Sequence, residues 1–403
     1  MSRTLVAGKR VKSMLAGVCF LMSLFPSVTH SQTAQFAGLA FLGDYKDLNS
    51  RFRHVRTAFG ELDTAALEVN KSLVGLLEKS DFKVGGYLLN VDELASFNET
   101  TLAIALGLQD VAVDTVPFNQ KWLHRYHVEG QVLLFDFDEM RIEASYPYRT
   151  TFEDSSSSDR PVSEHSAIIW KLLTSTEPDS VIDIWRQLLA TRDPYSNEKR
   201  INYGVRTVTI DPSIIELAKR KGVDRSALIA TTAQRFASML GGYFEIPIVP
   251  YTTGQAIGVK MAGRFSDTKI YQLQTPERDI AIDIDVPAFF YRTNQTKTRD
   301  EFLSAAYAEV KFEDELINGK KSSRHQVYLD ARFRAIDLRK FARVANVKLD
   351  KWQHTNESQL ALFAQIVRQI KARDRAALKD MSKTKGVSKQ LKNLCKQIEG
   401  CSS

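Results

Sequence analysis

The chain has 403 residues, a formal net charge of +7 and a hydrophobic fraction of 43 %. This length suits two domains and an appendage, and the hydrophobic fraction is ordinary for a chain that buries a core. Residues 1–31 hold four basic and no acidic side chains, and residues 341–403 hold 13 basic and five acidic ones. The body between them is therefore mildly acidic, which argues against a nucleic-acid partner. The basic tail is left to meet an envelope protein or a membrane surface.

Met1–Ser31 has the layout of a secretory signal peptide. A basic start precedes the apolar run Met14–Phe25, and the small residues Thr29 and Ser31 stand where signal peptidase reads the chain. The apolar run has about 12 residues, whereas a helix that spans a bilayer needs about 20. We therefore expect cleavage before Gln32 and export to the periplasm or the medium.

Residues 32–176 are predicted as a first module in which strands and helices alternate. Lys46–Gly60 is expected to be a loop, and Asp154–Pro161 a flexible break. The predicted strands are Phe36–Phe41, Asp81–Asn90, Gln131–Phe137 and Arg141–Tyr148; the predicted helices are a run from Asp63 or Thr64 to Leu77, Val91–Gly107, a helix end at Gln120–Tyr126, and Ser163–Leu173.

Residues 177–315 are predicted as a second module with the same order of elements. Gly241-Gly242 is expected to end its central helix. The predicted helices are Val181–Leu189, Ser226–Leu240 and Thr298–Val310, and the predicted strands are Arg200–Ile210, Phe244–Pro250, Lys269–Leu273 and Ile280–Tyr291.

A similar phrase closes both modules. VEGQVLLFDFDEMRIEASYPYRT (Val128–Thr150) and IAIDIDVPAFFYRT (Ile280–Thr293) each hold Asp-x-Asp in an apolar run and, further on, Tyr-Arg-Thr. This favours an α/β or α+β fold built from two similar layered modules with mixed sheets. A duplication should place Phe36–Phe41 on Val205–Ile210, and Gln131–Phe137 on Ile280–Val286.

The opening strand–helix–strand order is followed by a late Gly-x-Val strand (Gly130–Val132) before a hairpin. This layout resembles the α/β envelope domains of the curli secretion-channel family and of the amino-terminal part of the Tol–Pal propeller protein. The resemblance covers about 110 residues in each half. It implies a place in the cell envelope, and it supplies no functional residue.

Residues 316–403 are predicted as a C-terminal helical basic tail. A strand is expected at Gln326–Arg334 and a helix at Ser358–Leu378, before a mobile basic end from Met381. Cys395 and Cys401 are an even pair in a chain expected to be exported, so a disulfide between them is predicted; reduced thiols are the alternative.

The strings that mark common catalytic and cofactor sites are missing from the sequence. His124 and His127 are the nearest approach to a metal pair, but no third ligand is obvious, and interface or surface histidines are the simpler interpretation. We therefore expect no metal and no cofactor.

Two carboxylate pairs form the candidate polar site. Side chains alternate along a strand, so Asp136 and Asp138 should share one face, as should Asp283 and Asp285. Such pairs can bind a cation or act as general acid and base. They can also be the polar face of an edge strand, paired with Arg149 in the first half and with Arg292 in the second.

The sequence thus favours an exported, non-catalytic cell-envelope protein that binds or assembles with other envelope components and can form homo-oligomers. A secreted hydrolase that acts on glycans through the paired carboxylates is the second hypothesis. A small-ligand binding protein with a cleft between the halves is the third.

Overall fold

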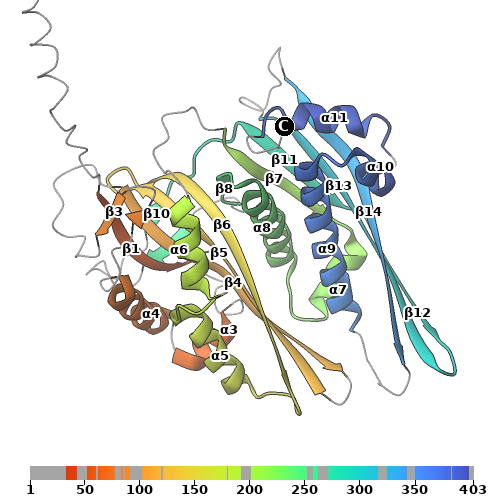
Figure 1. The fold of residues 1–403 in the computed structure, drawn as a ribbon, viewed down its shortest axis with the longest axis horizontal. Helices are drawn as coiled ribbons and strands as arrows, with labels where there is room; N and C mark the ends of the chain where they lie inside the picture. Colours follow the sequence, from red (N-terminus) through yellow and green to blue (C-terminus); the bar gives the residue numbers. More distant parts are fainter. Residues whose placement is uncertain are drawn as a thin grey trace, which may run out of the picture. The chain divides into compact units, whose positions relative to one another are not determined.

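Two mixed β-sheets, each carrying helices on one face, form the described part of the chain (Figure 1). The structure is a computed structural model, and Thr33–Ser403 cluster into one compact unit. The described residues are 33–42, 52–59, 62–77, 83–84, 87–90, 102–118, 121–178, 180–191, 201–251, 257–261, 271–315, 325–342, 350–382 and 384–398. The α/β or α+β class with a C-terminal helical part is confirmed.

The first sheet has eight strands in the order β10-β9-β1-β4-β5-β6, with β3 beside β1 and β2 beside β3. β1 runs parallel to β3 and β4, and the remaining pairs are antiparallel. Its strands are β1 (Thr33–Phe41), β2 (Lys83–Val84), β3 (Tyr87–Asn90), β4 (Leu102–Phe118), β5 (Lys121–Asp136), β6 (Arg141–Ser156), β9 (Ile257–Met261) and β10 (Tyr271–Leu273). Its helices are α3 (Arg53–Phe59), α4 (Leu62–Leu77), α5 (Val162–Thr174) and α6 (Val181–Thr191).

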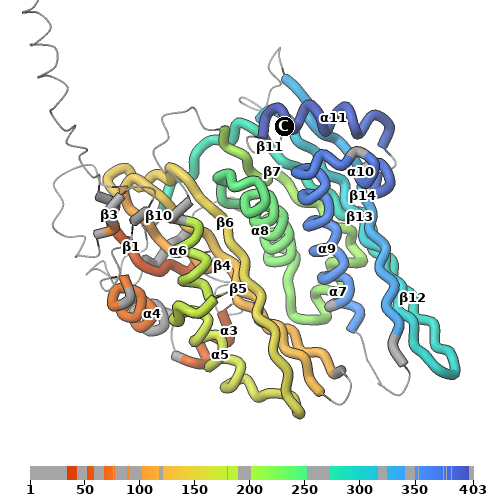
Figure 2. The backbone as a smooth tube through the Cα atoms, in the orientation of Figure 1, coloured from red at the N-terminus to blue at the C-terminus, as the bar shows by residue number. Residues whose placement is uncertain are grey.

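The second sheet has six strands, in the order β12-β13-β11-β7-β8 with β14 on β13. Its strands are β7 (Tyr203–Ile210), β8 (Ile248–Val249), β11 (Ile280–Val286), β12 (Phe289–Gln295), β13 (Arg299–Asp314) and β14 (Val327–Ala342). Its helices are α7 (Pro212–Lys219), α8 (Arg225–Phe244), α9 (Lys351–Ala372), α10 (Arg375–Met381) and α11 (Val387–Leu394). Figure 2 shows the C-terminal helices lying over this sheet.

The two sheets repeat one topology. Read from β3, the first sheet runs β3-β1-β4-β5-β6 and the second runs β8-β7-β11-β13-β14, with the same parallel and antiparallel pairs in the same places. The bulges match as well. Ala37 of β1 and Arg206 of β7 are each skipped in the pairing with the next strand, and so are Glu143 of β6 and Tyr328 of β14. Since a bulge fixes the register on both of its sides, these residues define matched positions in the two sheets.

Of the two predicted strand equivalences, the first agrees with this register and the second is wrong. The bulge at Ala37 and Arg206 puts Phe36–Phe41 on Val205–Ile210. The counterpart of β11 is β4, however, and not the β5 segment Gln131–Phe137. The Asp-x-Asp strings therefore stand on unmatched strands.

Several predicted elements need correction. Thr298–Val310 is not a helix but most of β13, because its even-numbered residues alternate into the core between two partner strands. Gln120–Tyr126 is not a helix end; residues 121–126 belong to β5. The predicted loop Lys46–Gly60 contains α3, and residues 102–107 of the predicted helix Val91–Gly107 are strand; residues 91–101 lie outside the described ones.

The C-terminal end and the break after β6 are also more ordered than predicted. Residues from Met381 onward form the end of α10 and all of α11, which buries Val387, Leu391 and Leu394. β6 runs on to Ser156, inside the predicted break. The helices predicted at Ser163–Leu173 and Val181–Leu189 are confirmed as α5 and α6.

The glycine pair in α8 does not end the helix. α8 continues through Gly241 and Gly242 to Phe244, and Glu245 follows in the left-handed conformation (φ 62°). A Cβ on Gly241 would lie 2.7 Å from Cγ of Pro147 in β6, so the glycine lets the helix approach this strand. The glycine that was predicted to end the helix is instead the point where α8 packs closely on β6 of the first sheet.

The predicted domain limits at residues 31, 176 and 315 stay predictions. The contacts add that Val181, Ile182 and Trp185 of α6 belong to the first core. β9 and β10 return from the second half of the chain to the first sheet, while β14 and α9–α11 complete the second. The described elements after residue 315, β14 and α9–α11, thus pack in the second layer.

Candidate functional site

The first predicted carboxylate pair is part of a turn. Asp136 is the last residue of β5, and its Oδ1 accepts hydrogen bonds from the backbone N–H groups of Asp138 and Glu139, both at 2.9 Å. Asp138 is exposed in the turn between β5 and β6. The two carboxylates therefore do not share a strand face, because the strand ends between them, and Asp136 acts as a turn cap.

The second pair does lie on one face of β11, but its partner is not the predicted one. Asp283 accepts hydrogen bonds from Arg206 Nε (3.0 Å) and from Thr207 Oγ1 (2.6 Å). The same guanidinium contacts Glu313 at 2.5 Å. The hydrogen bonds of Arg206 to Asp283 and Glu313 together raise the pKa of this guanidinium. Arg292, the predicted partner, is exposed on β12, beyond the turn that ends β11.

Asp285 lies one step further along the same face. Burial raises its pKa, and the neighbouring Glu309 raises it further against the opposing charge of Arg332. Arg332 itself forms an ion pair with Glu309 at 2.7 Å. Asp283 and Asp285 thus have different partners and do not act as a matched acid–base pair.

Glu313 is the most enclosed acid of this cluster, with 3 % of its side chain exposed. Burial alone would raise its pKa, but hydrogen bonds from Lys311, Arg206 and His325 outweigh burial and lower the pKa to about 2. A buried carboxylate with this many donors is held as a charged, structural group.

Arg149 also differs from its prediction. Its Nε lies 3.3 Å from Oε1 of Glu129, and Arg235 of α8 approaches the same oxygen at 3.3 Å. Glu129 is 1 % exposed. Burial lowers the pKa of Arg149, and Arg235 lowers it further against the opposing charge of Glu129. Arg149 therefore pairs across the strands with Glu129 and not with Asp136 or Asp138, and Arg235 links the same Glu129 to α8.

This contact belongs to a charged layer between the two repeats. Glu357 of α9 forms ion pairs with Arg125 of β5 at 2.9 Å and with Arg339 of β14 at 2.8 Å. Beside it lie two adjoining hollows of about 300 and 400 Å³, which share Arg149 and Met239 in their walls. α8 thus packs between β6 of the first sheet and β7 of the second, and α9 packs on β13 and β14 and reaches the first sheet through Glu357.

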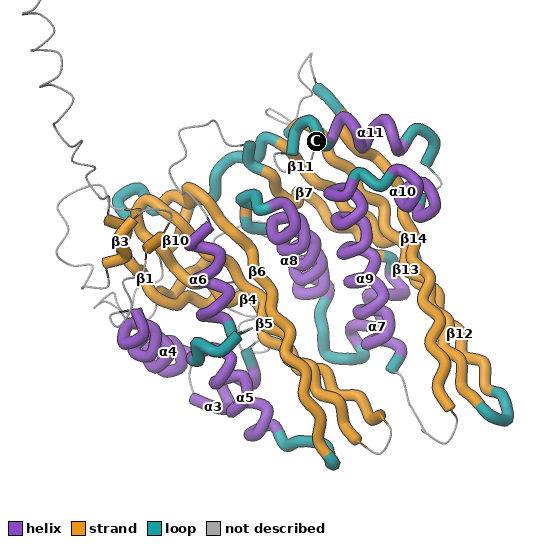
Figure 3. The backbone as a smooth tube through the Cα atoms, viewed as in Figure 1, coloured by secondary structure: helices purple, strands orange, loops and turns teal. Residues whose placement is uncertain are grey.

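Each sheet continues into an arm of three long antiparallel strands, which are drawn side by side in Figure 3. We call residues 110–118, 121–129 and 149–156 the first arm, and residues 289–295, 299–308 and 334–342 the second arm. On the second arm, Phe290, Ile336 and Leu338 are 47, 62 and 50 % exposed. With Leu303 and Ala305 between them on β13, they form an apolar surface, here called the open face.

The register matches every open-face residue to a residue on the same face of the first arm. Leu303 corresponds to Arg125 and Ala305 to His127, both on β5. Phe290 corresponds to Ala112, Ile336 to Thr151, and Leu338 to Glu153. Thr151 and Glu153 are exposed, whereas Arg125 contacts α9. This face is therefore mostly polar on the first arm and apolar on the second.

The two histidines noted in the sequence face opposite ways. His124 is fully buried toward α5, and Nε2 of His127 lies 3.2 Å from Asp114 in the charged layer. Three residues apart on a strand, they project from opposite faces and form no joint site.

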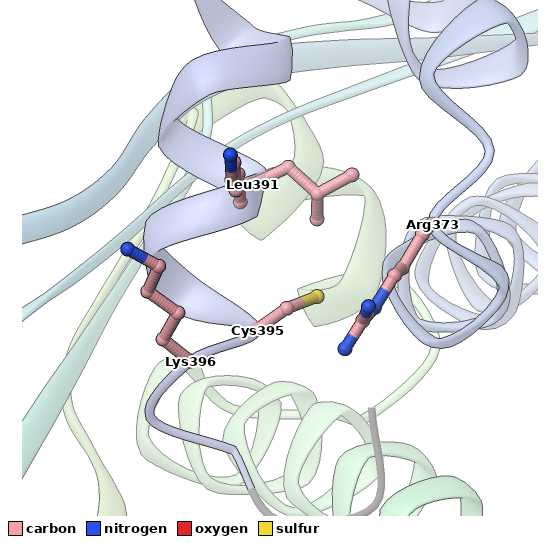
Figure 4. A pocket seen from close by; sticks show the side chains of 5 residues that line it. Arg373, Leu391, Cys395 and Lys396 are labelled. Carbon is pink, nitrogen blue, oxygen red and sulfur yellow. The ribbon is translucent and has the colours of Figure 1, made fainter. Parts of the chain in front are cut away.

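Cys395 is a buried thiol, not half of a disulfide. Its Sγ donates to the carbonyl oxygen of Ile370 at 3.5 Å, and it faces a hollow of about 210 Å³ with Leu391 and Arg373 (Figure 4). The predicted disulfide is therefore wrong, since the end of α11 turns this side chain into the core; Cys401 lies outside the described residues.

Comparisons with known proteins give little further guidance. No family model matches the sequence, and no curated protein matches it. A crystal structure of a minor lipoprotein from Acinetobacter baumannii aligns over 45 % of this chain and 94 % of its own, with 11 % identity and a TM-score of 0.18. A likeness of this size carries no argument about fold or function. Among the described helices, none is long and apolar enough to cross a membrane.

Proposed function

We propose that this protein is a non-catalytic, exported component of the cell envelope that assembles with further copies of itself through the open face of its second arm. Export rests on the signal-peptide pattern of residues 1–31. The layout resemblance to envelope domains points to the same compartment. Assembly rests on the comparison of the two arms.

The observation that carries the proposal is the exposed apolar surface formed by Phe290, Ile336 and Leu338. Large contiguous apolar patches on soluble proteins usually mark interaction sites. In stacked repeats, a terminal repeat that must face water carries a polar outer surface. Here the face of the first arm that lies toward α8 and α9 is mostly polar, whereas the open face of the second arm, at the end of the stack, is apolar. The second arm therefore has the composition of a surface that packs against another protein layer.

A second copy of this chain offers the matching occupant. Within the chain, α8 and α9, the helix layer of the next repeat, contact the outer face of the first arm through the ion pairs Arg235–Glu129 and Glu357–Arg125. The corresponding helix layer of a first repeat contains α4 and α5. Placing this layer of another copy on the open face continues the internal stacking, and it produces a head-to-tail series of chains.

The test is sedimentation velocity on the chain from Gln32 over about 1–100 μM, a range chosen because specific protein contacts commonly fall there. We expect mass to rise with concentration and to continue beyond a dimer. Ile336→Glu should weaken association by tenfold or more, since a charge would be buried in the contact. The matched control is Val327→Glu, also an exposed apolar residue of β14 (39 %) but about 30 Å further along the strand.

Other outcomes separate the parts of the proposal. A series that stops at a dimer would replace head-to-tail stacking with face-to-face packing of two arms. A chain that stays monomeric at the highest concentration, or an Ile336→Glu variant that associates like the unchanged protein, would rule out a second copy on this face. Export is tested separately, by fractionation and by mass spectrometry of the amino terminus.

No observation favours the hydrolase alternative. Asp136 is engaged in a turn, and Asp283 is held by Arg206 and Thr207. The ligand-cleft alternative has the hollow between the repeats, but Arg125 is already paired with Glu357 and Arg149 with Glu129. These groups hold the two repeats together, which is consistent with a structural role.

A further inference from the structure

A compact group of histidines lies under the first arm, separate from the open face. His124 comes from β5, His165 from α5, and Asp159 from the segment between β6 and α5. One ligand atom of each lies within 4.8 Å of those of the other two. The two histidines are 0 and 5 % exposed, whereas Asp159 is exposed.

We propose that His124, His165 and Asp159 bind a divalent transition-metal ion, with Zn²⁺ as the best fit. Two imidazoles and a carboxylate are a common zinc ligand set. Tetrahedral ligands at 2.0–2.2 Å from the metal stand about 3.4 Å apart. The three ligand atoms, which now lie within 4.8 Å of one another, would close to this spacing around an ion.

The outer hydrogen bonds of the histidines suit this role. Nδ1 of His165 contacts the hydroxyl of Tyr126 at 3.0 Å, which leaves Nε2 for the metal. Nδ1 of His124 contacts Thr115 Oγ1 at 3.2 Å, and its Nε2 now lies 2.7 Å from Ser156 Oγ. Ser156 also bonds to the Ser158 carbonyl, and it keeps that bond when Nε2 turns to an ion. Second-shell partners of this kind orient metal-binding imidazoles.

The surrounding charge also favours a cation. The charged groups that act on His124 are Asp154, Asp159 and Glu164 on one side and Arg160 on the other, so carboxylates predominate. Arg160 is itself paired with Asp154 at 2.7 Å.

A third imidazole adds an independent observation. The ring of His54 in α3 lies 5.9 Å from that of His165, between centroids. His54 is 6 % exposed, and its Nδ1 has no hydrogen-bond partner among the described residues. An unsatisfied buried nitrogen is costly, and a metal-bound water or a fourth ligand position would satisfy it.

The second repeat shows that the fold does not need this cluster. The residues matched to His124 and Tyr126 are Phe302 and Ser304, which are ordinary buried core residues under the second arm. Phe302 is apolar, and Ser304 needs only a 3.0 Å bond to Ser358 of α9. The histidines of the first repeat therefore do more than hold a helix on an arm, and a bound ion would clamp the start of α5 to β5.

The test is isothermal titration of Zn²⁺ into tag-free chain from Gln32 that has been stripped with a chelator. We expect one ion per chain, a rise in the thermal midpoint with Zn²⁺, and visible absorption of tetrahedral intensity when Co²⁺ replaces zinc. Asp159→Asn spares the fold because the residue is exposed, and it should weaken binding by at least tenfold. His165→Ala should abolish binding.

The matched control is His127→Gln, on the same strand as His124 but on its other face. It should bind Zn²⁺ like the unchanged chain. Absence of stoichiometric binding to the unchanged chain would overturn the proposal, as would Asp159→Asn and His165→Ala variants that bind normally. Loss of binding in His127→Gln alone would move the site to the charged layer and equally reject the one proposed here.

Discussion

The outer faces of the two sheets have opposite chemistry at matched backbone positions. In the first sheet, Ala37, Ala105, Leu133 and Phe135 belong to a buried apolar cluster. Their counterparts in the second sheet are the charged residues Arg206, Asp283, Lys311 and Glu313. In the arms the relation is reversed, because the polar face is the first one.

The comparison separates two kinds of information in a repeated fold. The skipped residues Ala37 and Arg206 keep the same backbone irregularity while their side chains share nothing. Bulges fix register and twist, so they persist as long as the topology does. The side chains instead report what covers each face, and this is why the exchange of chemistry between the arms locates a contact surface.

The largest expected effect comes from exchanging chemistry at one matched position. Phe135→Glu gives the first sheet the residue that the second sheet has at Glu313. Phe135 is 0 % exposed and lies in the apolar cluster, so the carboxylate would be buried among hydrophobic side chains. We expect a loss of about 4 kcal/mol or more in the free energy of unfolding, measured by urea denaturation.

The control for this exchange is Phe152→Glu, on β6 of the same sheet and 38 % exposed. It should change the free energy of unfolding by about 0.5 kcal/mol or less. Equal losses in the two variants would mean that the outer face of the first sheet is not enclosed, and the contrast between the sheets would fail.

A smaller effect tests the charged face of the second sheet through pH. The pKa of Glu313 is lowered from 4.5 to about 2, so the folded state holds this carboxylate charged. Its contribution is complete above about pH 4.5 and is lost as the pH falls toward 2. Glu313→Gln should remove about 3 kcal/mol at pH 7 and flatten the loss of stability over this range.

Thermal melts from pH 7 to pH 2.5 measure this difference. Glu309→Gln is the comparison, because Glu309 lies on the same face of β13 but in a more exposed ion pair. Its partner Arg332 has 61 % of its side chain exposed. Its loss should be below about 1 kcal/mol. A Glu313→Gln variant with an unchanged pH profile would show that the three donors do not stabilise this carboxylate.

Sequence patterns predicted those parts of the fold that depend on local periodicity. α5 and α6 have apolar residues at helical spacing. Phe36–Phe41 is an apolar run, and Val205–Ile210 is rich in the β-branched residues Val, Thr and Ile. β13 was missed because Ala305, Ala306 and Ala308 favour a helix locally. Its strand state comes from pairing along its whole length with β14, which lies beyond a connection of 12 residues (315–326).

The candidate site was harder to predict for a related reason. Arg206 and Asp283 are 77 residues apart, and Arg149 and Arg235 meet at Glu129 only because α8 packs on β6. His124 was noted in the sequence, but His127, three residues later, faces away. The neighbour of His124 in space is His165, which lies in α5, 39 residues beyond Tyr126. Spacing along one strand indicates faces, but it cannot supply partners from other elements.

The smallest expected effect concerns the Asp-x-Asp string with which the two halves were first compared. Asp136→Ala removes an acceptor for two backbone N–H groups at the β5–β6 turn, both partly open to water. The cost should be about 1 kcal/mol, the net value of exposed hydrogen bonds of this type. Asp138→Ala, two residues further along the chain and exposed, should cost about 0.5 kcal/mol or less. Because Arg149 pairs with Glu129 instead, neither variant should disturb the charged layer, and the self-association measured by sedimentation should stay unchanged. Equal effects of the two substitutions would show that they act as a pair after all, whereas a selective effect of Asp136→Ala fits a turn cap that has no counterpart at Asp283.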